Sequence, residues 1–175
     1  MPWVMNHKIA SRPEGAPELK PMPQSLAKIY VHLVFSTKNR ERVLPDDIRP
    51  DLHAYMGGTL NGLGCTPIEI NSEPDHAHSL FVMTRTMSLS DVVGQLKKCA
   101  NDWLRSRGPE FANFHWQGGY GAFSVSQSVS QSAVEEVRNY IRKQREHHQR
   151  ISFQDELRAL LKRYEVEHDE RYVWD

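Results

Sequence analysis

The sequence lacks long apolar runs, and no stretch of about 18 apolar residues is present that could cross a membrane. The N-terminus also lacks the basic and then apolar order of a secretory signal. Cysteine is scarce: the chain of 175 residues has only Cys65 and Cys99, and these form no CxxC pair. This argues against a zinc ribbon or a disulfide framework. We therefore expect a cytoplasmic protein without a membrane partner.

An excess of charge of either sign is also missing. Lys plus Arg and Asp plus Glu both number 22. Nucleic-acid binders usually carry a basic excess, because the release of counterions from phosphates drives their affinity. Any basic surface must therefore be local, and for each basic cluster a merely solvated face is the commoner explanation. The clusters are Lys38, Arg40 and Arg42; Lys97, Lys98, Arg105 and Arg107; and Arg138, Arg142, Lys143, Arg145 and Arg150.

The length suggests one domain that is large enough to bury a core. Residues 1–22 contain four prolines and no hydrophobic periodicity, which predicts a flexible leader before a domain at 23–175. A polar run at 124–132 contains a tandem SVSQ repeat and predicts a linker.

The remaining pattern alternates between strands and helices. Strands are expected at 26–36, 66–72 and 78–84, with two short strands within 114–126 around Gly118-Gly119. Helices are expected at 45–63, from a cap at Ser88 or Ser90 to Gly108, at 133–148, and after a cap at Ser152. This order predicts an α+β fold, with an antiparallel sheet and helices packed on one face.

The tetrapeptide Asp75-His76-Ala77-His78 stands at the start of a predicted strand. Residues i and i+2 of a strand point to the same face, so His76 and His78 could chelate one divalent metal while Ala77 turns into the core. Alone, the pattern is weak, because two surface histidines are commoner and a metal usually needs a third protein ligand. A histidine-triad nucleotide enzyme is disfavoured, because position 80 is Leu80.

A second pattern pairs Tyr140 with Gln144 on a predicted helix. Positions i and i+4 share a helix face, so the phenol and the carboxamide should lie one turn apart. The commoner explanation for such a tyrosine is a packed ring with a solvated hydroxyl. His32, inside an apolar strand, is expected to be a buried and hydrogen-bonded histidine.

Together, the two patterns resemble the small single-tyrosine HUH transposases of bacterial insertion sequences and their REP-associated relatives. That family carries His-hydrophobic-His on a strand and Tyr-x-x-x-Gln on a later helix, here His76-Ala77-His78 and Tyr140 to Gln144. The segments IYVHLVFSTKNR, WQGGYGAFSVS and SFQDELRALLKRY are also similar, and the resemblance covers about residues 24–175. The sequence departs from the family in the small Ala77 and in one extra SVSQ unit.

The resemblance implies a ferredoxin-like HUH nuclease fold with the histidines on a central strand. It also implies that His76, His78 and Gln144 bind Mg²⁺ or Mn²⁺. Two imidazole ligands favour Mn²⁺ or a later first-row transition metal. Tyr140 would attack the scissile phosphate and form a 5′-phosphotyrosine, although no base that activates the phenol stands out in the sequence.

The implied substrate is single-stranded DNA with hairpin-marked ends, and the implied assembly is a homodimer with active sites shared in trans. The expected DNA contacts are Lys38, Arg40, Lys97, Lys98, Arg142 and Lys143. The alternative is a domesticated or inactive relative that binds DNA hairpins as a dimer without cutting them.

Overall fold

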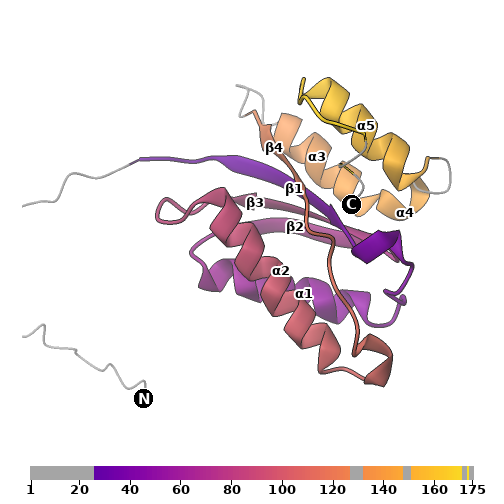
Figure 1. The fold of residues 1–175 in the computed structure, drawn as a ribbon. Coiled ribbons are helices and arrows are strands. Elements are labelled where there is room, and N and C mark those ends of the chain that lie inside the picture. Colours follow the sequence, from indigo (N-terminus) through magenta and orange to yellow (C-terminus); the bar gives the residue numbers. More distant parts are fainter. Residues whose placement is uncertain (1–25, 127–131, 148–150, 171–172, 174–175) are drawn as a thin grey trace, which may run out of the picture.

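The computed structural model describes residues 26–126, 132–147, 151–170 and 173 (Figure 1). The expected leader at 1–22 lies outside these residues. Four antiparallel strands form one sheet in the order β2-β3-β1-β4. They are β1 (Tyr30–Ser36), β2 (Thr66–Glu73), β3 (His76–Val82) and β4 (Gly121–Val125). The strand that carries the two histidines, β3, therefore lies inside the sheet, as predicted.

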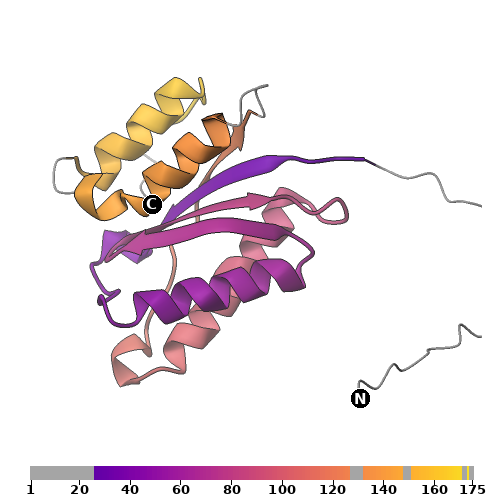
Figure 2. The same ribbon diagram turned by 180° about the vertical axis from the view of Figure 1, so that it is seen from behind.

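Helices cover both faces of this sheet. The helices are α1 (Arg49–Gly62), α2 (Leu89–Arg105), α3 (Ser132–Arg142), α4 (Gln144–His147) and α5 (Phe153–Arg163), with short 3-10 turns η1 (Lys38–Arg40) and η2 (Pro109–Phe111). Figures 1 and 2 show α1 and α2 on one face, with α3, α4 and α5 on the other. None of the helices in the described ranges is long and apolar enough to span a membrane.

The α+β class and the antiparallel sheet are confirmed, and the second helical layer adds to the single layer that we expected. The reason lies in β1, whose burial is nearly continuous along the strand. A strand that is apolar on both sides needs cover on both faces. Leu33 and Phe35 join the core under α1 and α2, whereas Val34 packs against α5 on the opposite face.

The second layer buries polar residues together with apolar ones. Val34 and Phe123 pack against the apolar side of α5, and Leu80 packs with Ile141 of α3. His32, His76 and His78 are buried as well, at 1%, 1% and 0% exposure. The sheet face beneath α3 and α5 thus contains the imidazoles whose chemistry the sequence singled out.

Two predicted helix caps are confirmed. The Ser88 hydroxyl accepts a hydrogen bond from the Asp91 amide at the start of α2, at 3.1 Å. The Ser152 hydroxyl accepts one from the Asp155 amide at the start of α5, at 3.2 Å. These caps depend on local sequence alone, because each satisfies an amide three residues away.

The region 114–126 forms one strand rather than the two expected. Only β4 joins the sheet there, and Trp116 makes an isolated bridge to Thr37. The carbonyls of residues 117–119, which would pair with a neighbouring strand, instead accept hydrogen bonds from the Lys97 ammonium. This lysine, which comes from α2, thus satisfies three carbonyls that no strand pairs with.

The predicted linker at 124–132 is wrong at both of its ends. Ser124 and Val125 belong to β4, where they pair with Val31 and Tyr30. Ser132 already begins α3. The rest of the SVSQ repeat, at 127–131, lies outside the described residues.

The predicted helix 133–148 is interrupted, which is a correction that affects the site. α3 ends at Arg142, and Gln144 begins the separate helix α4. The Asn71 side-chain amide of β2 donates to the carbonyl oxygen of Ile141 at 2.7 Å and to that of Arg142 at 3.4 Å. A side chain that takes these carbonyls competes with the helical hydrogen bonds, and such insertions break helices. Gln144 therefore does not share a helix with Tyr140.

Candidate active site

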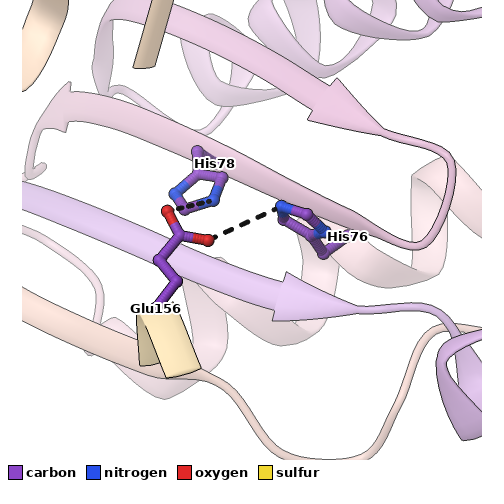
Figure 3. A group of neighbouring side chains, drawn as sticks. All are labelled: His76, His78 and Glu156. Carbon is purple, nitrogen blue, oxygen red and sulfur yellow. Dashed lines mark ion pairs between the residues drawn. The ribbon is translucent and has the colours of Figure 1, made fainter. Parts of the chain in front are cut away.

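His76 and His78 lie on one face of β3, as the strand alternation predicted. Their ring centroids are 5.2 Å apart. Ala77 is fully buried on the other face, in the core beneath α1 and α2. Figure 3 shows the two imidazoles directed toward Glu156, which comes from α5.

Asp75 orients the first of these imidazoles. The His76 Nδ1 lies 2.7 Å from an Asp75 carboxylate oxygen. Burial opposes ionisation of Asp75, but the hydrogen bond from His76 and the charges of His76 and Arg42 hold the pKa of this carboxyl below its usual value. An ionised carboxylate keeps an imidazole proton on Nδ1, so in the neutral form of His76 the lone pair is on Nε2 and is directed toward Glu156. Carboxylate–histidine pairs hold metal ligands in this way.

His32 is the expected buried histidine, and it contacts His78. Its Nε2 lies 3.0 Å from His78 Nδ1. Burial, together with the nearby His78, lowers the pKa of His32 to about 3, so this ring is neutral at pH 7. If His32 Nε2 accepts the proton of His78 Nδ1, then His78 Nε2 is left with a free lone pair. That Nε2 is buried and has no hydrogen-bond partner among the described residues.

Glu156 is the functional candidate that sequence reasoning missed. It lies on α5 and is 3% exposed. Its Oε2 lies 3.8 Å from His76 Nε2, and its Oε1 lies 3.6 Å from His78 Nε2. Within the described residues, the possible ligand atoms of these three side chains lie within 4.8 Å of one another, a spacing suited to one metal ion. A carboxylate on the apolar side of α5, beside Phe153 and Leu157, is the signal that could have revealed it.

Tyr140 meets this cluster from α3. Its hydroxyl donates a hydrogen bond to Glu156 Oε1, and its ring lies edge-on to His78 with centroids 6.0 Å apart. Burial, the charge of Glu156 and this hydrogen bond raise the pKa of Tyr140 well above its ordinary value, while a hydrogen bond with Gln144 acts in the opposite direction. The phenol is therefore protonated at neutral pH.

Gln144 reaches the same carboxylate from α4, despite the break in the helix. Its Nε2 donates to Glu156 Oε1 at 3.1 Å. The side chain is fully buried, and its Oε1 has no hydrogen-bond partner among the described residues. The residues predicted for the site thus converge with Glu156, and all of them belong to one chain.

A cavity of about 720 Å³ leads to the phenol. Its lining includes Tyr140, Glu156, Arg163 and Tyr164, from α3, from α5 and from the residue after α5. The lining also includes His32 of β1 and Val125 of β4, so the cavity lies between the sheet and these helices and gives a ligand access to Tyr140.

Comparisons with known proteins identify the family of the chain. The family model described as "Transposase IS200 like" matches residues 25–144. The chain belongs to the IS200-like transposase family. The match contains His76, His78, Tyr140 and Gln144 and ends before α5. Transposases of this family are in general metal-dependent enzymes that cut and transfer DNA, which agrees with a candidate metal site beside a tyrosine.

Solved structures support the fold. A candidate transposase from Deinococcus radiodurans R1 is 23% identical, with a TM-score of 0.53, and the match covers 72% of this chain and 98% of that chain. A REP-associated tyrosine transposase bound to a REP hairpin is 13% identical, also with a TM-score of 0.53, and 74% of each chain is covered. No curated protein matches the chain.

The DNA contacts expected of this transposase do not form one surface. Lys97 and Lys98 lie on α2, across the sheet from Arg142 and Lys143 (Figure 1). Lys97 is 9% exposed, and burial lowers its pKa to about 8. The Arg142 guanidinium donates to a Glu69 carboxylate oxygen at 2.7 Å.

The other expected DNA contacts differ in position. Lys38 and Arg40 belong to η1, just after β1, and Lys38, Lys98 and Lys143 are exposed. A DNA-binding role for each of the six remains a prediction.

Proposed function

We propose that this transposase cuts and rejoins single-stranded DNA at hairpin-marked ends, with Tyr140 as the nucleophile and a divalent metal held by His76, His78 and Gln144. The observation that carries the proposal is the convergence of a phenol with two buried imidazoles on one sheet face. The hairpin complex of the REP-associated relative supports hairpin DNA as the substrate class.

The residues present fit a metal ion. His78 Nε2 and Gln144 Oε1 are buried acceptors without a hydrogen-bond partner in the described part of the chain. Buried polar atoms of this kind need a partner, and a cation supplies one for both. Amide oxygen suits Mg²⁺, and the two imidazoles favour Mn²⁺. When bound, the ion would polarise the scissile phosphate and stabilise the charge that develops on it.

Tyr140 would form the covalent intermediate. Its oxygen gives up its proton and bonds to phosphorus, the bond from phosphorus to the 3′-oxygen breaks, and the leaving oxygen takes up a proton to become a 3′-hydroxyl. The DNA stays attached as a 5′-phosphotyrosine. One phosphate ester replaces another, so a 3′-hydroxyl can later attack this linkage and rejoin DNA without a nucleotide cofactor.

The cavity beside α3 and α5 favours an unpaired strand. Its volume of about 720 Å³ is within the usual range for sites that hold small molecules, roughly 300–1,000 Å³. Such a space suits one or two nucleotides and not a duplex.

We further infer that the working form is a homodimer in which α3 can dock on the partner. In the single chain, α3 is held to β2 by side chains: Glu69 accepts hydrogen bonds from Arg138 and Arg142, and Asn71 donates to the end of the helix. A second copy presents the same groups, so equivalent contacts can form in trans. The family resemblance favours the trans arrangement, which would join His76 and His78 of one chain to Tyr140 of the other.

Covalent trapping tests the function. The protein is incubated with hairpin oligonucleotides that carry single-stranded flanks, with Mn²⁺, and separated on a denaturing gel. We expect a protein–DNA adduct that requires the metal. Tight hairpin binding without any adduct would contradict the proposal and support the alternative of a non-cutting hairpin-binding relative.

A further inference from the structure

We propose that Glu156 is a ligand of the active-site metal and that it also positions the Tyr140 hydroxyl beside that ion. The inference rests on the proposed function, because it adds a group to the same site. It concerns a part of the chain that the family match does not reach, since that match ends at residue 144 and α5 begins at Phe153.

The first argument is burial. The Glu156 side chain is 2% exposed. A buried carboxylate is costly unless it is paired or binds a metal. Tyr140 and Gln144 both donate to its Oε1. Its Oε2 is directed toward His76 Nε2 (Figure 3).

The second argument is spacing. The carboxylate oxygens lie 3.6 and 3.8 Å from the two Nε2 atoms, which is too far for a hydrogen bond. Ligands about 2.1 Å from an octahedral ion lie about 3.0 Å apart when adjacent and about 4.2 Å apart when opposite. The observed separations fall between these values. The three side chains therefore have the spacing of ligands around one ion, at ion-pair rather than hydrogen-bond distance from one another.

The third argument is charge. His76, His78 and Gln144 are neutral when they bind a metal, so on their own they would leave a divalent ion with its full charge in a buried site. Glu156 would offset half of that charge. Its Oε1 would still accept the hydrogen bond from Tyr140, so one carboxylate would connect the ion to the nucleophile. The competing explanation is a metal-free ion pair between Glu156 and protonated imidazoles.

Mn²⁺ binding to the full chain separates these explanations. Calorimetry compares the wild type, Glu156→Gln, His78→Ala and the control Asp155→Asn. Asp155 is a neighbouring carboxylate on α5 whose side chain is 65% exposed. We expect Glu156→Gln to weaken Mn²⁺ binding at least tenfold, because even groups that only support a ligand contribute about 10- to 100-fold. Asp155→Asn should bind as the wild type does.

The outcomes distinguish the two proposals. Weak binding by His78→Ala with wild-type binding by Glu156→Gln would overturn the inference and leave the proposed function intact. A wild type that binds no Mn²⁺ would overturn the metal dependence in the proposed function, and the inference with it.

If Glu156→Gln does not fold, anomalous scattering from Mn²⁺ in crystals of the wild type decides the matter. A Glu156 oxygen at about 2.1–2.3 Å from the ion supports the inference, and one beyond 4 Å overturns it.

Discussion

Replacing Tyr140 with Phe removes the proposed nucleophile and also one hydrogen bond that stabilises the fold. From the sequence, the loss of a marginal hydroxyl would hardly affect folding. In the structure, this hydroxyl donates to the buried carboxylate of Glu156. A hydrogen bond to a charged group contributes about 1.5–3 kcal/mol. Glu156 keeps the bond from Gln144 in the variant, so the lower value, about 1.5 kcal/mol, is the reasonable expectation.

This free energy corresponds to a measurable change in melting temperature. For a domain of roughly 150–250 residues, 1 kcal/mol shifts the Tm by about 2–4 °C. We therefore expect Tyr140→Phe to melt about 3–6 °C below the wild type, measured by circular dichroism in a chelating buffer. The covalent adduct should be absent, while hairpin binding in a gel-shift assay should stay close to wild type.

Tyr164→Phe is the matched control. Tyr164 lines the same cavity and stacks on Phe123, with ring centroids 4.8 Å apart. Its variant should still form the adduct. An adduct at wild-type level in Tyr140→Phe would refute the assignment of the nucleophile. An unchanged Tm would refute the hydrogen-bond argument, whatever happens to the adduct.

Three further predictions concern the metal, pH and assembly. Single replacement of His76 or His78 by Ala should weaken Mn²⁺ binding at least tenfold in calorimetry, and unchanged affinity in both variants would contradict the site. Burial and the nearby Arg49 lower the pKa of His53 from 6.5 to about 4. As the pH falls, His53 is therefore protonated in the unfolded chain before it is protonated in the folded protein. The free energy of unfolding should be highest above pH 6.5 and fall by about 2 kcal/mol as the pH approaches 4, which urea titrations measure. His53→Gln should lack this part of the loss, and an equal loss in that variant would exclude the histidine as its source. Mixing a chain that lacks both His76 and His78 with a Tyr140→Phe chain should restore the adduct, on the chain with mutated histidines, if sites are shared in trans. No recovery in proven heterodimers would rule out sharing.

The features that sequence reasoning predicted correctly are those determined by nearby residues. Strand alternation alone places His76 and His78 on one face and Ala77 on the other. The caps at Ser88 and Ser152 act over three residues, so their hydrogen bonds follow from the local sequence. The place of β3 inside the sheet came from the family resemblance, because no local pattern encodes strand order.

The features that were missed depend on contacts between distant segments. At the break before Gln144, a carbonyl of α3 accepts a hydrogen bond from Asn71, which lies 70 residues from Ile141 in the chain. Near Gly118, where a second strand was expected, the carbonyls accept hydrogen bonds from a lysine ammonium of α2. No periodicity near either position contains this information, because the competing hydrogen-bond partner comes from another element.

Helix α5 links the stability of the sheet to the chemistry of the site. Phe153, Leu157 and Leu161 cover Val34 and Phe123, and the same turns of the helix direct Glu156 into the cluster of imidazoles. A chain that ended at Gln144 would contain the whole matched family segment and every residue of the two sequence motifs. It would nevertheless leave Val34 and Phe123 without the apolar side chains of α5, and Tyr140 without its carboxylate acceptor. The proposed active site therefore depends on a helix that lies outside the matched family segment.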